Sequence, residues 1–283
     1  MYFRNVRRLH RLINESDEIP TSAGWLGKEP LMTKFKKLPL SQRRTLSVAA
    51  VKAGQVYGKN NEKWVSQMYK SQSEYTDQRN KNEKTDKEKS IWPKGGFAAI
   101  KRAATEQKRR IRHVLTGEPT KEGVFKYGMY IVLRLFTELP FRNTFASLQI
   151  SKSAEGNYID VPKRGNITFH LRQFKNSKQI GEREFTLTKA NSTALRKYLT
   201  YREAAGVTHK FLLSTKSGAQ MTRGTLGKAL HKLTKELLGK SFGSRLIRIL
   251  ASSSVKPEID KAMEMSEKLL HGRMKQTKQY TRK

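Results

Sequence analysis

Six residues of this sequence have side chains suited to chemistry at a phosphate group. Guanidinium groups bind phosphate oxygens through paired hydrogen bonds and do not titrate near neutral pH, so they suit the holding of a scissile phosphate. A phenol, with a pKa of ~10, needs a strongly positive field to become a nucleophile at neutral pH. The six residues are Arg142, Lys175, Arg245, Arg248, His271 and Tyr280.

The last two of these residues are nine positions apart, and Tyr280 stands three residues from the end of this sequence. In a chain with a formal net charge of +34, we expect Tyr280 to offer its phenol to a phosphate. The alternative is a tail tyrosine that packs on the surface. His271 by itself would be typical of a helix-ending residue favoured by the helix dipole. Because both residues belong to an ordered set of six, we favour a role in a phosphate site over these structural alternatives for His271 and Tyr280.

The charge balance predicts a polyanionic partner. Lysine and arginine number 58 against 24 acidic residues, and a charge this large opposes folding by self-repulsion. Nucleic acid is the default partner, and binding should depend strongly on salt because phosphate contacts release counterions. A membrane surface is the rival polyanion. However, no apolar run approaches the ~18 residues of a spanning helix, and the charged stretch Met1–Pro20 has no signal-peptide pattern.

The sequence contains no cysteine, which excludes disulfides and thiolate zinc sites. Histidines other than His271 show no metal-ligand spacing, so we expect neither a metal nor a cofactor. The absence of cysteine suits a reducing compartment. We expect an intracellular protein located with DNA, in cytoplasm or nucleus.

The composition and the apolar pattern change along the chain, and its length suggests about two domains. Residues 1–34 are predicted to form a basic N-terminal arm. Residues 35–114 are predicted to be a helical DNA-binding domain that ends in a basic linker. Residues 115–283 are predicted to be a catalytic domain, and the boundary is placed at the turn residues Gly117-Glu118-Pro119. The expected fold class is mostly α with a small β-sheet (α+β).

Two basic segments lie outside the six candidates. A short helical candidate in the arm carries Arg4, Arg7, Arg8 and Arg11. Near residue 110, the simplest interpretation is a solvated basic linker, and contact with the DNA backbone is the alternative; the residues concerned are Lys108, Arg109 and Arg110. Trp64 and Trp92 are expected to anchor the core or the linker rather than to stack on bases.

A buried helix is predicted to position the first arginine. Val124–Phe136 is apolar on nearly every side, which is typical of a central helix, and the helix must end before Pro140. Arg142 would then stand at the edge of the core. Arg134 belongs to the apolar periodicity of the helix and is not expected to replace Arg142.

Short strands are predicted to position the lysine. They are expected at 157–161, 166–174 and 183–187, with Lys175 in the turn between the last two. Lys178 in the same turn is the obvious competitor.

Two later helices are predicted to position the remaining candidates. Leu226–Leu237 forms one apolar face and Gly239 is its expected C-cap. Arg245 and Arg248 are one helical turn apart, and Arg248, among apolar neighbours, is expected to be partly buried and to need an anionic partner. A last helix should span Glu258–Leu270 and close at Gly272.

Taken in order, these features resemble the tyrosine recombinase (integrase) family. His271–Tyr280 is similar to the closing motif of that family, and Phe136–Arg142 is similar to its first arginine box, especially in large DNA viruses and Polinton-like mobile elements. Phe174–Gly181 looks like their Tyr-Lys-Thr-x-x-x-x-Gly hairpin. Thr85–Trp92 resembles the stretch that joins their DNA-clasping helical domain to the catalytic domain. The resemblance covers about residues 35–283, and its specificity lies in the order of the motifs.

The resemblance implies a role for each candidate. Tyr280 would attack a DNA phosphate, leaving a 3′-phosphotyrosine and a free 5′-hydroxyl. Arg142 and Arg248 would hold the non-bridging oxygens. Lys175 would protonate the departing 5′-oxygen as general acid. His271 would hydrogen-bond the phosphate or assist proton movement. Because the covalent bond conserves the phosphodiester energy, religation would need neither ATP nor metal.

The sequence departs from the family pattern at two positions. The family usually has histidine three residues before its second arginine, where this chain has Arg245. Arginine can donate to phosphate but cannot shuttle a proton near pH 7, so an altered rate is expected rather than lost activity. The first box commonly has an acid three residues after its arginine, where this chain has Phe145.

The resemblance predicts a site-specific recombinase or integrase that works on double-stranded DNA. Its helical and catalytic domains would form a clamp around the duplex, and four protomers would assemble on two sites. A relaxing topoisomerase of the type IB kind, with the same chemistry as a monomer, is the alternative within this chemistry. From other classes, a non-catalytic DNA-packaging protein and a degenerate recombinase retained for binding stay open.

Overall fold

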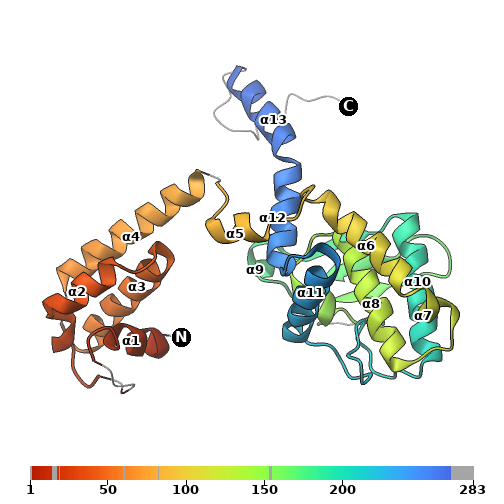
Figure 1. Ribbon diagram of the computed structural model, residues 1–283, viewed down its shortest axis with the longest axis horizontal. Helices are drawn as coiled ribbons and strands as arrows, with labels where there is room; N and C mark the ends of the chain where they lie inside the picture. The colour runs from red at the N-terminus through yellow and green to blue at the C-terminus, as the bar shows by residue number, and fades with distance from the viewer. Residues whose placement is uncertain are drawn as a thin grey trace. The chain divides into compact units, whose positions relative to one another are not determined.

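The computed structural model describes residues 2–14, 18, 20–59, 61–81, 83–152 and 155–268. The chain divides into two compact units, Met1–Thr85 and Asp86–Lys283, which are described separately (Figure 1). The described residues are mostly helical and include one small antiparallel sheet, which confirms the expected α+β class.

The first unit is helical. It contains α1 (Tyr2–His10), the 3-10 turn η1 (Gly24–Gly27), α2 (Glu29–Lys36), α3 (Leu40–Val56) and α4 (Glu62–Asn80). Trp64 is fully buried at its centre, where its indole Nε1 donates to the carbonyl of Leu26 at 2.8 Å. The ring of Phe35 meets Trp64 edge-on, with centroids 4.9 Å apart. The expectation that Trp64 anchors the core is confirmed.

The N-terminal residues belong to this core rather than to an arm. Val6 and Leu9 on α1 are buried in the same apolar cluster as Leu46 of α3. Trp25 and Leu31, also within the expected arm, are buried there as well. The expected arm 1–34 therefore contributes apolar side chains without which the cluster would be open on one side.

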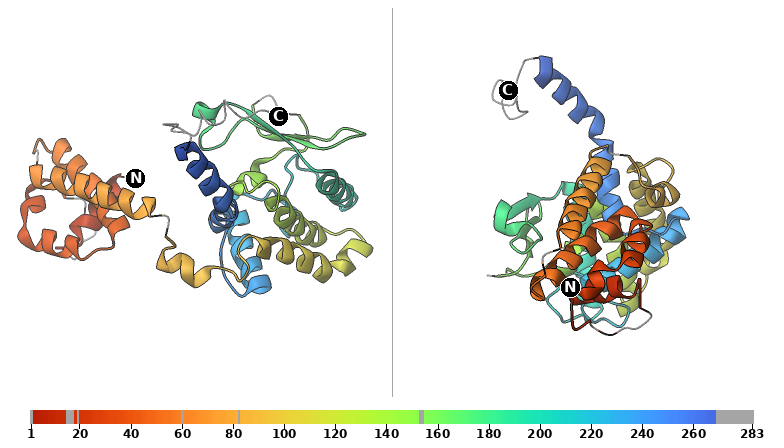
Figure 2. Two further views of the ribbon diagram at one scale, coloured as in Figure 1. Left: turned by 90° about the horizontal axis from the view of Figure 1, so that it is seen from above. Right: turned by 90° about the vertical axis from the view of Figure 1, so that its left-hand side faces the viewer.

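The second unit holds every other element. In chain order these are α5 (Asp86–Ile91), α6 (Ala98–Arg110), α7 (Arg112–Thr116), α8 (Lys121–Phe136), the 3-10 turn η2 (Asn143–Ser147), β1 (Tyr158–Asp160), β2 (Thr168–Leu171), α9 (Ser177–Ile180), β3 (Arg183–Thr186), α10 (Lys189–Ala204), α11 (Arg223–Leu238), α12 (Ser244–Ser254) and α13 (Lys256–Lys268). Helix α8 packs against both α6 and α10, and the sheet lies along one side of these helices (Figure 2).

The boundary between the units falls between Thr85 and Asp86, whereas the sequence predicted it near residue 115. Helix α6 buries Ile100 and Ala103 in the same core as α8, so the chain is already inside the second unit before Gly117. Gly117 and Pro119 form only the connection between α7 and α8. The observed boundary coincides with the start of the stretch Thr85–Trp92.

Helix α8, the three strands and α11 lie where the sequence predicted elements that position the site. Helix α8 spans the buried stretch, and its N-cap Thr120 accepts a hydrogen bond from the backbone N–H of Gly123 at 3.0 Å. The strands pair in the order β1-β2-β3, with Ile159 opposite Phe169 and Phe169 opposite Phe185. All three strands are shorter than expected. Gly239 ends α11 in the left-handed conformation at φ 67°, which glycine adopts without strain.

A half-buried histidine helps to fix the segment after α10. The Nδ1 of His209 receives hydrogen bonds from a guanidinium N–H of Arg202 at 3.1 Å and from the backbone N–H of Phe211 at 3.2 Å. Two donors on Nδ1 require a neutral ring with its proton on Nε2, which lies 3.0 Å from Ser214 Oγ. Burial lowers the pKa of His209, and the charge of Arg202 lowers it further.

The second unit is therefore expected to lose stability in mild acid. Because the pKa of His209 is lower in the folded than in the unfolded chain, its contribution is complete above the unfolded pKa of ~6.5 and is lost as the pH falls below it. The melting temperature measured from about pH 7.5 to about pH 5.5 should fall, and His209→Gln should flatten part of this slope. The exposed His113→Gln serves as the matched control. An unchanged slope in His209→Gln would contradict the assignment.

Candidate phosphate-binding site

Arg142 stands at the edge of the aromatic core, as the sequence predicted. Helix α8 ends at Phe136, and the ring of Phe141 then packs against Phe145 at 5.5 Å and Phe185 at 5.1 Å between centroids. These contacts fix the backbone just before Arg142. The side chain of Arg142 is exposed at the start of η2.

Arg248 lies on α12, which buries Leu246, Ile247 and Leu250 against the core. Its side chain is half-buried, as expected from its apolar neighbours. Burial lowers the pKa of the Arg248 guanidinium, and the positive charge of Arg142 lowers it further. The fold thus brings the two arginines, separated by more than a hundred residues in sequence, within electrostatic reach of each other.

Neither arginine has an acidic partner in the described ranges. The side chains of Arg142 and Arg248 form no ion pair or hydrogen bond with any residue that the structure describes. Two like charges within electrostatic reach of each other and without a counter-charge favour the binding of an anion nearby. This pair is the centre of the candidate site.

Arg245 has a different environment from Arg248, one turn later on the same helix. Its side chain is 85% exposed and its guanidinium lies 3.6 Å from the carboxylate of Glu88 on α5. The ammonium of Lys240 also donates to the carbonyl of Ser90 at 2.9 Å. The short helix α5 is therefore held against the start of α12, and Arg245 already faces an anionic group.

Lys175 is exposed in the turn that follows β2. The connection to β3 is longer than a simple turn and includes the short helix α9, where the competitor Lys178 is also exposed. Within the part of the chain that the structure describes, neither ammonium forms a hydrogen bond or an ion pair. Both lysines remain candidates on exposure alone.

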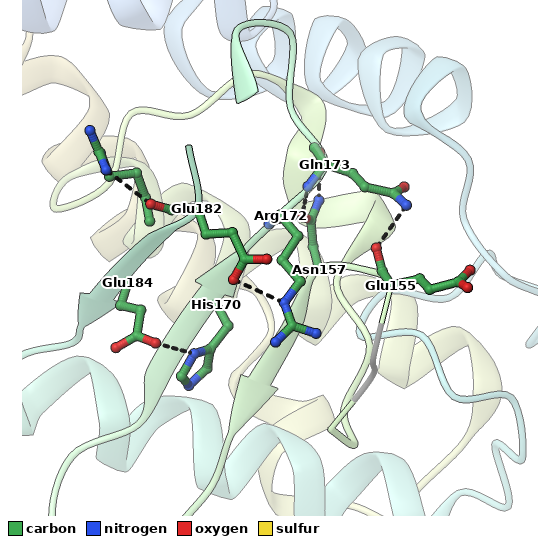
Figure 3. Close-up of polar contacts among 8 residues, drawn as sticks. Glu155, Asn157, His170, Arg172, Gln173, Glu182 and Glu184 are labelled. Carbon is green, nitrogen blue, oxygen red and sulfur yellow. Dashed lines mark hydrogen bonds and ion pairs between the residues drawn. The ribbon is translucent and has the colours of Figure 1, made fainter. Parts of the chain in front are cut away.

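The base of this connection is held by Asn157, which is 2% exposed (Figure 3). Its side-chain Oδ1 accepts from the backbone N–H groups of Arg172 at 2.8 Å and Gln173 at 2.7 Å. Its Nδ2 donates to the carbonyl of Gln173 at 2.8 Å. Arg172 also pairs with Glu182 across the connection, at 3.2 Å. Arg172 and Gln173, which precede Lys175 by three and two residues, are thus fixed.

The same asparagine connects the lysine turn to the segment that begins at Arg142. Nδ2 of Asn157 also donates to Ser147 Oγ, on η2, at 3.2 Å. The guanidinium of Arg223, at the start of α11, donates to the same Ser147 Oγ at 3.3 Å. Asn143, next to Arg142, donates in turn to the backbone carbonyl of Arg223 at 2.9 Å. One polar network therefore joins the turn, η2 and α11.

The sequence did not single out these supporting residues. Asn157 and Ser147 are polar residues in short loops, and no spacing distinguishes them from their neighbours. Arg223 could have been noticed as a cation in the first turn of an amphipathic helix, where cations are unfavourable and need a reason. It adds a positive charge beside the segment that carries Arg142.

The last two of the six candidates fall at the end of the chain. His271 and Tyr280 lie outside the described residues, as does the predicted end of the last helix at Gly272. Helix α13 is described from Lys256 to Lys268, starts close to the expected Glu258 and directly follows α12. The segment that leads from Arg248 to His271 is thus helical as far as it is described.

The basic residues at 108–110 lie on a helix rather than in a linker. They occupy the last turn of α6, whose other face packs on α8. Arg109 and Arg110 both bond to the carboxylate of Glu106, at 2.9 and 3.0 Å, and these bonds lower the pKa of Glu106. Lys108 is exposed. Part of the positive charge expected for DNA contact is therefore already balanced.

Comparisons of the chain with protein-family models, with curated proteins and with solved structures find no match. Among the described residues, no three or more acids and histidines gather as metal ligands would. No helix in the described ranges has the length and apolar character needed to cross a membrane.

The arginine pair is expected to bind small phosphate analogues. Pyrophosphate at constant ionic strength should raise the melting temperature of the second unit, by about 2–4 °C for each kcal/mol of binding free energy. Arg142→Gln and Arg248→Gln should each remove most of this rise, because one guanidinium alone lacks the paired field. The exposed loop arginine Arg164, changed to glutamine, is the matched control. An equal rise in all four proteins would show that the anion acts nonspecifically.

Proposed function

We propose that this protein is a site-specific DNA recombinase of the tyrosine recombinase type, which breaks and rejoins DNA strands through a 3′-phosphotyrosine on Tyr280. The observation that carries the proposal is that Arg248 lies within electrostatic reach of Arg142, and that neither has an acidic partner among the described residues. These are the two arginines that the family resemblance assigns to the scissile phosphate. The network through Asn157 and Ser147, which ties the turn of Lys175 to the same region, supports it further.

In the proposed cleavage step one bond to phosphorus forms and one breaks, and a proton is transferred on each side of the phosphate. The Tyr280 oxygen attacks phosphorus, the bond from phosphorus to the 5′-oxygen breaks, and the Lys175 ammonium gives its proton to that oxygen. Arg142 and Arg248 stabilise the negative charge that grows on the non-bridging oxygens. His271 hydrogen-bonds the phosphate or assists in moving the phenolic proton. The reverse step with a different 5′-hydroxyl completes strand exchange.

Arg245 is proposed to donate to the same phosphate or to the one beside it. Arginine does not titrate near neutral pH, so it serves as a charge and a donor but not as a proton shuttle. Any proton transfer that the usual histidine performs at this position falls to another group. We therefore expect a slower enzyme rather than an inactive one.

The helical first unit is proposed to bind the same duplex. Arg4, Arg7 and Arg8 lie on the exposed side of α1, while Val6 and Leu9 hold the opposite side in the core. None of the three guanidinium groups has a partner among the described residues. Cations fixed on a rigid helix can follow a phosphate backbone at little entropic cost. Four protomers on two sites would supply the strands for exchange.

The nucleophile can be tested with a nicked duplex whose cleaved end diffuses away and traps the intermediate. Wild type should give a covalent protein–DNA adduct on a denaturing gel, and Tyr280→Phe should give none, because it lacks the attacking oxygen. Arg142→Ala should slow adduct formation by about 10²–10³-fold, the cost of one transition-state donor.

Three results would change the interpretation. Absence of an adduct from wild type over a range of candidate sites would contradict the enzyme and favour a DNA-packaging or binding protein. An adduct with Tyr280→Phe would place the nucleophile elsewhere. Supercoil relaxation by a monomer, without sequence preference, would favour the topoisomerase. Tyr130→Phe in the buried core of the second unit is the matched tyrosine control.

The arginine side of α1 should govern part of the DNA affinity. Changing Arg4, Arg7 and Arg8 together to glutamine should weaken binding and reduce the salt slope by about 0.9 for each phosphate that is no longer neutralised. The measurement is the dissociation constant at several salt concentrations. The control changes Lys59, Lys63 and Lys70, which are exposed in the same unit, to glutamine. Equal weakening in both triple variants would mean that net charge, not this helix, determines affinity.

A further inference from the structure

We infer that Asn157 is a positioning residue that fixes Lys175 relative to Arg142, and so directs the general acid toward the departing 5′-oxygen. The inference rests on the proposed function. It adds to that function a residue outside the set of six, one that touches neither DNA nor Tyr280 in the proposed step and acts only through the backbone that carries Lys175.

The side chain of Asn157 uses all of its principal hydrogen-bonding capacity inside the protein. Oδ1 accepts two backbone N–H groups, those of Arg172 and Gln173, at 2.8 and 2.7 Å. Nδ2 donates to the carbonyl of Gln173 at 2.8 Å and to Ser147 Oγ at 3.2 Å. A polar side chain that is 2% exposed and fully bonded has one allowed orientation, because any other leaves buried groups unpaired.

Only an amide fits this place without loss. An aspartate could accept the two N–H groups, but it has no N–H to give to the carbonyl of Gln173 and would bring a negative charge against that oxygen. An alanine would leave two N–H groups and one carbonyl unpaired at the end of β2. The chemistry of the position therefore demands both a donor and an acceptor, which identifies a constraint on the turn rather than simple filling of space.

The constraint reaches Lys175 through the chain. Gln173 lies two residues before Lys175, and its side-chain Nε2 donates to the carbonyl of Glu155 at 2.7 Å, on the loop that leads to Asn157 (Figure 3). On the other side of the lysine, the N–H of Gln179 bonds to the carbonyl of Asn176 at 3.0 Å, so the first turn of α9 forms directly after Lys175. Since the Lys175 ammonium has no bond in the described chain, its direction depends on how firmly these flanking residues are held.

The bond to Ser147 fixes the lysine turn relative to the segment that carries Arg142, and not only relative to its own strand. Ser147 ends η2, which begins directly after Arg142, and its Oγ donates to the carbonyl of Thr144 at 2.9 Å. General acid catalysis requires the donor within hydrogen-bond reach of the leaving oxygen while the arginines hold the same phosphate. A single amide that bonds both segments meets that requirement.

The test compares two DNA substrates that differ in one atom. In the second, sulfur replaces the bridging 5′-oxygen at the scissile phosphate. A thiolate, with a conjugate-acid pKa of ~8.5, leaves without protonation, whereas an alkoxide needs a proton. Loss of a correctly placed general acid must therefore slow cleavage of the oxygen substrate only.

Asn157→Ala should slow cleavage of the oxygen substrate by about 10²-fold, at the lower end of what a general acid contributes, and the sulfur substrate by only a few fold. Lys175→Ala should show the same pattern more strongly, and Lys178→Ala should show none of it. Ser147→Ala keeps the bonds of Asn157 to the turn and removes its side-chain bond to η2. It should give the same selective loss, on a smaller scale.

Asn191→Ala is the matched control. Asn191 is also a buried asparagine of the second unit, but its side chain bonds to Arg134 and Glu138 and not to the turn. Its loss should lower the melting temperature and leave the ratio of the two cleavage rates unchanged.

Each outcome decides a separate point. Equal slowing of both substrates by Asn157→Ala would make Asn157 structural only and would overturn the inference. If Asn157→Ala does not fold, Ser147→Ala carries the test, and an unchanged rate ratio in that variant overturns the inference equally. Absence of an adduct from wild type with both substrates would instead overturn the proposed function.

Discussion

The positive charge shared by Arg142 and Arg248 is the constraint on which the site depends. Bringing two guanidinium groups together costs free energy, and a half-buried position on α12 increases that cost because water screens it less. A fold retains such a pair only if packing elsewhere compensates, and the ring contacts among Phe136, Phe141 and Phe145 supply packing directly behind it. The stability of the apolar core thus compensates the free-energy cost of the charged site.

Polar residues at the base of the candidate site give it a defined geometry. Charged side chains on the surface move, and long ones lose affinity through the entropy of being fixed. Here the backbone of the lysine turn, the start of η2 and the start of α11 are bonded to each other through Asn157, Ser147 and Arg223. The side chains that would meet a phosphate can therefore be mobile at their tips while their attachment points are fixed.

Much of the second unit could be predicted from its apolar pattern. The buried stretch of α8, the stop before Pro140 and the C-cap at Gly239 each have a local physical cause that the sequence displays. Tertiary contacts have no such local signal. Gly117 and Pro119 mark a change of chain direction that the sequence displays. Whether a domain boundary lies there depends on the tertiary contacts of the preceding helix, and Ile100 of that helix packs in the core of the second unit.

The same limit applies to the first residues and to the site. Val6 and Leu9 are isolated among arginines in the sequence, and only the presence of α3 makes them core residues. Helical spacing placed Arg245 and Arg248 one turn apart on α12. Arg245 nevertheless pairs with Glu88, whereas Arg248 experiences the charge of Arg142, because different elements lie next to the two residues. The bonds of Asn157 reach residues ten or more positions away, which no short-range pattern reveals.

The contact between Glu88 and Arg245 gives Arg245 an anionic partner within the protein. The side chain of Arg245 is 85% exposed whereas that of Glu88 is only 16% exposed, so the pair is open to competing anions from the arginine side. Competition works in both directions. An anion bound at Arg245 would compete with Glu88 for the guanidinium and would weaken one of the contacts that hold α5 beside the start of α12. Occupancy of Arg245 and the placement of α5 are thereby thermodynamically linked.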